Sequence, residues 1–97
     1  MRVVIVEPDK APYEREIEDS LEELQGIVDG MIETTYDRLL PGAVIVCNEE
    51  GKLINLPMNR CIGSDIIFGT FFVCGEDGED FCSLTDEQVK EALEIYA

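Results

Sequence analysis

The stretch Val3-Val4-Ile5-Val6 decides the fold that this sequence predicts. It is a short apolar run rich in β-branched residues, and Pro8 closes it soon afterwards. Such a run is typical of a strand buried on both faces, so we expect it at the centre of a sheet. Residues 43–48 form a second run of this kind, and residues 65–74 predict a further strand with a bulge at Gly69.

Between the first two runs, the apolar period becomes helical from residue 13 to about residue 29. The apolar stripe of this helix would consist of Ile17, Leu21, Leu24 and Val28. Residues 31–36 contain Ile32, two threonines and a tyrosine, a composition that favours a strand. The helix would carry the chain to this strand by a right-handed crossover.

The second half of the chain contains a hairpin signal and a helix start. Glu49-Glu50-Gly51 separates the strand at residues 43–48 from an alternating stretch at residues 52–56. This spacing predicts a hairpin with Gly51 in the left-handed conformation. Thr85-Asp86-Glu87-Gln88 is a capping box with Thr85 as the N-cap, and it predicts a terminal helix.

These elements predict one domain that spans residues 1–97, because a chain of this length buries a single core. The expected class is α+β, in the order β-α-β-β-β-β-α. We expect one small mixed sheet of four to five strands, with two helices on one face.

The charge balance restricts the kind of partner. The chain contains seven Lys and Arg residues and 22 Asp and Glu residues, which gives a formal charge of −15, and 45% of its residues are hydrophobic. The chain is therefore expected to fold and to repel phosphate backbones and anionic lipid, which argues against direct nucleic-acid binding and membrane attachment. A basic protein surface is the expected partner, and the oligomeric state stays open.

The residue types also restrict the chemistry. The chain has no His and no Trp, so imidazole bases and His-containing metal sites are excluded. No nucleophile with an adjacent base can be named, and we expect neither catalysis nor a cofactor. The sequence Asp77-Gly78-Glu79-Asp80 looks superficially like a calcium loop but lacks its twelve-residue pattern, so no metal site is assigned.

The four cysteines, Cys47, Cys61, Cys74 and Cys82, contain no Cys-x-x-Cys pair. Cys47 and Cys74 each end an apolar run, where a thiol behaves as a small buried hydrophobe. We therefore expect reduced thiols rather than a zinc site or disulfides. Acidic residues and a proline directly after residue 6 argue against a signal peptide, so we predict a cytoplasmic protein.

One face of the predicted first helix is anionic. Its residues are Glu16, Glu18, Asp19, Glu22, Glu23 and Asp29. This face could simply keep the protein soluble. It could also mimic nucleic acid, because carboxylates one helical turn apart lie about 6 Å from each other, a spacing comparable to that of backbone phosphates.

The residues Lys52, Asn59 and Arg60 form a cationic and polar island in this acidic chain. Together they could bind an anion such as a nucleotide phosphate or a carboxylate. No Gly-rich phosphate loop accompanies them. The structural alternative is that Arg60 forms an ion pair with one of the many carboxylates.

Several segments, in order along the chain, carry a family resemblance. They are Asn48-Glu49-Glu50-Gly51-Lys52-Leu53, Leu56-Pro57-Met58-Asn59-Arg60, Gly69-Thr70-Phe71-Phe72-Val73-Cys74-Gly75 and Ser83-Leu84-Thr85-Asp86-Glu87-Gln88. With the opening Val-Glu-Pro and the helix around Leu24, they resemble the domain of unknown function 3846 family. The resemblance implies no settled activity and no catalytic residues. It implies an origin in Gram-positive bacteria, their phages and their conjugative elements.

These observations together predict a non-enzymatic interaction protein of a phage or mobile element. Its acidic helix would dock on a basic surface, in the concrete form of an antirestriction or anti-defence mimic of nucleic acid. The alternative is a protein that binds or sequesters a nucleotide or another small anion at Lys52, Asn59 and Arg60.

Overall fold

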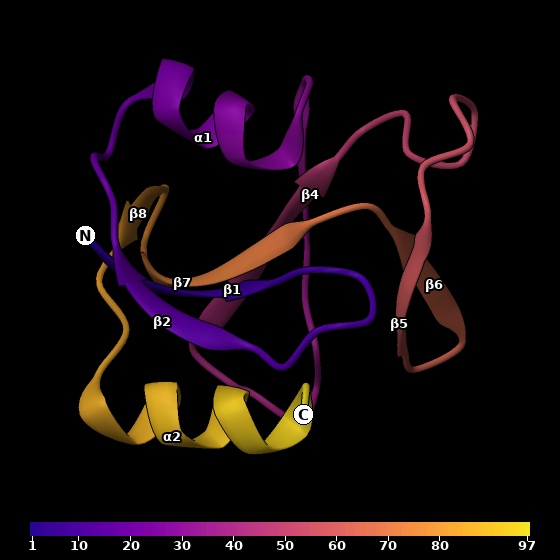
Figure 1. Cartoon of the computed structure of the whole chain (residues 1–97). Coiled ribbons are helices and arrows are strands. Elements are labelled where there is room, and N and C mark those ends of the chain that lie inside the picture. Colours follow the sequence, from indigo (N-terminus) through magenta and orange to yellow (C-terminus); the bar gives the residue numbers. More distant parts are fainter.

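The computed structural model describes residues 1–97 and confirms the α+β class. Its elements are β1 (Arg2–Val6), β2 (Tyr13–Glu16), α1 (Leu21–Val28), β3 (Ile32–Thr35), β4 (Ala43–Asn48), β5 (Met58–Ile62), β6 (Asp65–Phe68), β7 (Phe71–Asp77), β8 (Asp80–Cys82) and α2 (Asp86–Ile95). Five strands pair in the order β2-β1-β7-β4-β3, and β8 adds to β7 (Figure 1). β5 and β6 form a separate hairpin.

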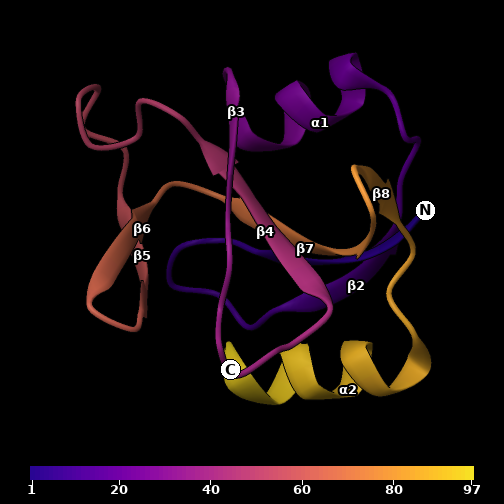
Figure 2. The same cartoon turned by 180° about the vertical axis from the view of Figure 1, so that it is seen from behind.

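The central strands β1, β7 and β4 are covered on both faces. One apolar layer contains Val4, Ile45, Phe71 and Val73 together with Val89, Ala92 and Tyr96 from the α2 region. The other contains Val3, Val44, Phe72 and Cys74 together with Leu24 and Val28 of α1. Figures 1 and 2 show α1 and α2 on opposite sides of the sheet. The prediction of both helices on one face is therefore wrong, because strands buried on both faces need a cover on each.

The main sheet has six strands rather than four to five, and all strand pairs are antiparallel, so the prediction of a mixed sheet is wrong. β1 and β3 are not neighbours, since β7 and β4 lie between them. They also run antiparallel, so the expected crossover from the first strand to β3 is wrong. α1 instead connects the two edge strands, β2 and β3, across one face of the sheet (Figure 2).

The first helix is shorter than its apolar period predicts. Residues 13–16 form β2 and pair with β1. The helix begins after Ser20, whose hydroxyl accepts a hydrogen bond from the backbone N–H of Glu23 at 3.2 Å, a typical N-cap contact. Leu21 is 59% exposed, and Ile17 is buried from the preceding loop rather than from the helix.

The predicted hairpin is displaced along the chain. Residues 49–55 form turns, and the hairpin consists of β5 and β6 instead. Gly51 does not take the left-handed conformation. It lacks a side chain because a Cβ would lie 2.8 Å from the carbonyl oxygen of Phe68.

Gly69 ends one strand rather than forming a bulge within it. Its φ of +83° turns the chain between β6 and β7, which belong to different sheets. A Cβ there would also lie 2.7 Å from Cδ1 of Leu56. Both features favour glycine, because other residues rarely adopt a positive φ.

The terminal helix begins as predicted. Thr85 is its N-cap, and Gln88 completes the capping box. At its other end, the ring of Tyr96 packs edge-on against Phe71 with 5.5 Å between centroids, and its hydroxyl donates to Asp37 Oδ2 at 2.8 Å. α1 and α2 have 8 and 10 residues, and no helix has both the length and the apolar character needed to span a membrane.

Asn48 is the buried polar residue that joins α1 to β4. It is 7% exposed. Its Nδ2 donates to the carbonyls of Val28 and Asp29, both at 3.1 Å, and its Oδ1 accepts from the N–H of Glu50 at 2.7 Å. Asn48 therefore fixes the C-terminus of α1 and the turn after β4 together.

We predict that Asn48→Ala lowers the free energy of unfolding by about 2 kcal/mol or more, because it leaves several backbone groups without partners. Urea unfolding measures this change. Ser64→Ala, in the exposed turn between β5 and β6, is the control and should unfold like the wild type. Equal stability of all three proteins would contradict this role of Asn48.

The two thiols that end apolar runs are buried, as predicted: Cys47 is 5% and Cys74 0% exposed. Burial raises the pKa of Cys47 from 9.0 to about 11, and neighbouring Glu33 adds to the effect. Burial likewise raises the pKa of Cys74 from 9.0 to about 12. Neither thiol is paired, and Cys61 is exposed.

These raised pKa values predict lower stability in alkali. Above about pH 9 the unfolded chain releases thiol protons that the folded chain retains until about pH 11 to 12, so the free energy of unfolding falls through this window. Urea unfolding at several pH values measures the slope. Cys47→Ala and Cys74→Ala should each flatten it, and a wild-type stability that does not fall above about pH 9 would contradict the prediction.

Candidate functional site

The six acidic residues predicted to share a helix face lie on several elements. Glu16 lies in β2, Glu18 and Asp19 lie in the following loop, Glu22 and Glu23 lie in the first turn of α1, and Asp29 is its C-cap. The premise of one helical face is therefore wrong, because β1 pairs with residues 13–16 and the Ser20 cap starts the helix late.

Two of these carboxylates have contacts within the fold. Glu16 lies 3.3 Å from the amino group of Met1. Glu23 is half-buried, and its Oε2 accepts a hydrogen bond of 3.5 Å from the N–H of Glu18. Glu23 therefore supports the start of α1, since both its backbone and its side chain bond to the residues before the helix.

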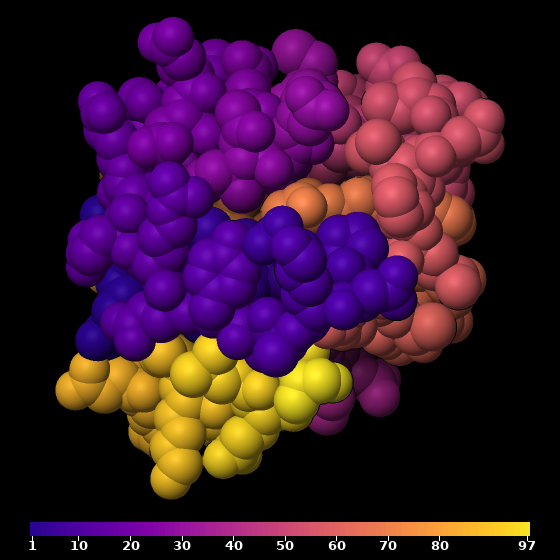
Figure 3. Space-filling model, in the orientation of Figure 1, coloured from indigo at the N-terminus to yellow at the C-terminus, as the bar shows by residue number.

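The remaining four, Glu18, Asp19, Glu22 and Asp29, are exposed and form no ion pair. Figure 3 shows the segment from β2 to α1 as a continuous stretch of surface, in indigo and purple. In the whole molecule, only five of 22 carboxylates form ion pairs. Most of the negative charge is therefore available to a partner.

Asn59 acts within the fold. Its Nδ2 donates to the carbonyl of Val6 at 2.9 Å and to that of Gly69 at 2.8 Å. It therefore fastens β5 to the end of β1 and to the break between β6 and β7.

Arg60 completes this set of contacts. Its Nε and Nη2 donate to the carbonyl of Tyr96 at 3.1 and 3.0 Å, and Nη2 also reaches the carbonyl of Lys10 at 2.7 Å. Nη1 donates to Oδ1 of Asn59 at 2.7 Å. The expected ion pair with a carboxylate is wrong, because all partners of Arg60 are neutral oxygens.

The structure thus brings Asn59 and Arg60 together but gives Lys52 other partners. Its Nζ lies 3.5 Å from Oδ1 of Asp65 and 5.8 Å from the centre of the Phe68 ring. The anion site stays a prediction that these contacts do not favour, since an anion would have to compete for donors that are already used.

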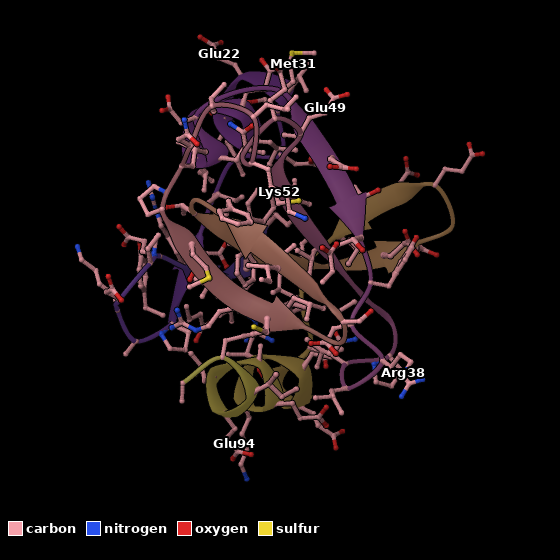
Figure 4. All side chains as sticks on the ribbon, turned by 90° about the vertical axis from the view of Figure 1, so that its right-hand side faces the viewer. Glu22, Met31, Arg38, Glu49, Lys52 and Glu94 are labelled. Carbon is pink, nitrogen blue, oxygen red and sulfur yellow. The ribbon has the colours of Figure 1, made fainter.

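A groove that sequence reasoning missed lies beside Lys52. It has a volume of about 230 Å³ and is lined by residues 33–35, 47–53 and 65–68. Figure 4 shows the Lys52 side chain between β6 and β3, with Glu49 above it. Glu33, Glu50 and Asp65 also line the groove. No sequence signal indicated it, because it forms only when the β5–β6 hairpin packs near β3.

The structure holds no group of three or more His, Cys, Asp or Glu residues that could hold a metal ion. The calcium-like segment at residues 77–80 forms the turn between β7 and β8, in which Asp77 is paired with Asp80. Its carboxylates thus belong to a tight hairpin.

Arg60→Lys tests the structural role of the guanidinium. Lysine keeps the charge but cannot reach several carbonyls at once, so we expect a loss of about 1 to 3 kcal/mol in the free energy of unfolding. Urea unfolding measures it, with the exposed Arg38→Lys as the control. An Arg60→Lys protein as stable as the wild type would contradict this structural role. A phosphate-induced rise in the melting temperature of the wild type that the variant loses would support an anion site.

Comparisons with known proteins identify the family to which the chain belongs. No curated protein and no solved structure matches this chain. The family model described as domain of unknown function (DUF3846) matches residues 1–97, the whole chain, and so confirms the predicted resemblance. The chain therefore belongs to the DUF3846 family.

Proposed function

We propose that this domain binds a positively charged surface of another protein through its β2–α1 surface, defined as Glu16, Glu18, Asp19, Glu22 and Asp29. The observation that carries the proposal is that four of these five carboxylates are exposed and unpaired on one continuous segment. A net charge of −15 adds long-range attraction to any basic partner.

In its most specific form, the proposal is mimicry of nucleic-acid charge. The partner would be the basic groove of a restriction enzyme, nuclease or repressor, in the host of a phage or mobile element. The mimicry would depend on the folded surface rather than on one helix, since α1 carries only Glu22 and Glu23. Carboxylates carried by a strand, a loop and a helix would together take the place of the phosphates that such a groove binds.

Charge reversal tests the proposal. We expect Glu18→Lys/Asp19→Lys/Glu22→Lys to weaken binding by at least about tenfold, because these contacts are electrostatic and exposed. Glu23 is left unchanged, since its carboxylate supports the helix start. The partner is first identified by capture from host lysate, and its Kd is then measured with purified proteins at rising salt.

The matched control reverses the same number of charges elsewhere, as Asp77→Lys/Glu79→Lys/Asp80→Lys in the β7–β8 turn. It should bind within about threefold of the wild type. Binding that persists at about 0.5 M salt, or that falls equally in both variants, would overturn the proposal. Urea unfolding of each variant establishes that the fold is intact.

A further inference from the structure

The two edge strands of the six-stranded sheet, β2 and β3, differ in how readily another strand could pair with them. β2 carries three charged side chains in four exposed residues, Glu14, Arg15 and Glu16. β3 has the sequence Ile-Glu-Thr-Thr, with a single charge, and pairs only with β4. Several charged side chains on an edge discourage the addition of another strand, whereas an edge with one charge and free backbone groups is more open to it.

The register shows which backbone groups of β3 are free. The carbonyl oxygen of Met31 accepts a hydrogen bond from the N–H of Glu49 at 2.9 Å, so the backbone groups of this pair point toward each other, on the β4 side of β3. In an antiparallel ladder, hydrogen-bonded and non-hydrogen-bonded pairs alternate along the strand. The backbone N–H and C=O of Glu33 therefore also point toward β4, where Glu33 is paired with Cys47. Ile32 and Thr34 therefore direct their N–H and C=O groups outward, where no strand lies.

The groove described above borders this edge. Residues 33–35 of β3 form one wall, and residues 65–68 of β6 form the other. β6 likewise pairs on one side only, with β5. An extended segment added to β3 would therefore place the side chains of one of its faces in the groove.

The chemistry of the groove identifies the occupant. Glu33, Glu49, Glu50 and Asp65 face a single cation, Lys52, which leaves a net charge of −3 among these lining residues. The Lys52 ammonium is already held by Asp65 and the Phe68 ring. Leu53, which also lines the groove, is 79% exposed. The complement of this groove is a segment that carries both basic and aliphatic side chains.

We propose that an extended, positively charged segment of a partner protein adds to β3 as a further strand and inserts its side chains into the groove between β3 and β6. This site is separate from the β2–α1 surface and goes beyond the function proposed above. Backbone hydrogen bonds to Ile32 and Thr34 supply the affinity, and the carboxylates of the groove select basic side chains.

The test uses a synthetic peptide that alternates Lys and Val over about seven residues, the length of an ordinary strand. Its binding to the isotope-labelled domain is followed by NMR. We expect the largest shifts of backbone signals at residues 32–35 and 65–68. Two further peptides carry N-methyl groups on the Lys amides or on the Val amides. Only one of them should lose binding, by at least about tenfold, because alternate amides face opposite sides of a strand.

Thr34→Pro is the matching change in the domain. It removes an outward N–H without breaking a bond to β4, and proline is tolerated at such edge positions. We expect it to weaken peptide binding at least about tenfold. The control is Glu14→Pro on β2, where the bond from the N–H of Ile17 to Met1 O places Glu14 outward in the same way. It should bind within about twofold of the wild type.

Glu33→Lys/Glu49→Lys provides a second variant if Thr34→Pro fails to fold, and it should also weaken binding. Shifts centred on α1 or β2, unchanged binding by the folded Thr34→Pro protein, or equal effects of both N-methylated peptides would overturn the proposal. The Glu18→Lys/Asp19→Lys/Glu22→Lys protein separates the two functions. It should retain the peptide, so failure of the β2–α1 surface leaves this result intact.

Discussion

The burial of β1, β7 and β4 on both faces is the constraint on which the rest of this structure depends. Strands without a polar face cannot leave either side to water, so each side needs its own apolar cover. α1 supplies one cover with Leu24 and Val28, and the α2 region supplies the other with Val89, Ala92 and Tyr96. The positions of both helices, and of the edges they leave open, follow from this requirement.

The sequence predicts those features that local residues determine. The strand at Ala43–Asn48 and the capping box of α2 occur as expected. The long first helix does not, because an apolar spacing of three and four residues also arises by chance. Ile17 is buried from a loop, while Leu21 is exposed. The continuous apolar runs already implied a helix on each face of the sheet. The strand order, which sets the neighbours of β1, depends instead on long-range pairing.

The candidate sites show the same division. The excess of acidic residues is visible in the composition, and their exposure follows from it. The roles of Glu23 and Arg60 cannot be read from the sequence, because each side chain bonds to backbone groups that only the fold brings near it. Arg60 bonds to carbonyls from two distant parts of the chain, Lys10 and Tyr96. A carbonyl is present at every residue, so no sequence pattern distinguishes such a partner.

The position of β7 between β1 and β4 has a consequence for how the protein forms during synthesis. Val4 pairs with Val73, so one side of β1 stays without its neighbour until most of the chain has left the ribosome. The β1–β2 hairpin can form early, since its register is local. The complete sheet cannot form early, because β7 pairs with strands that are far from it in the sequence. The nascent chain therefore exposes apolar strands until β7 emerges, and the many carboxylates along it oppose aggregation in that interval.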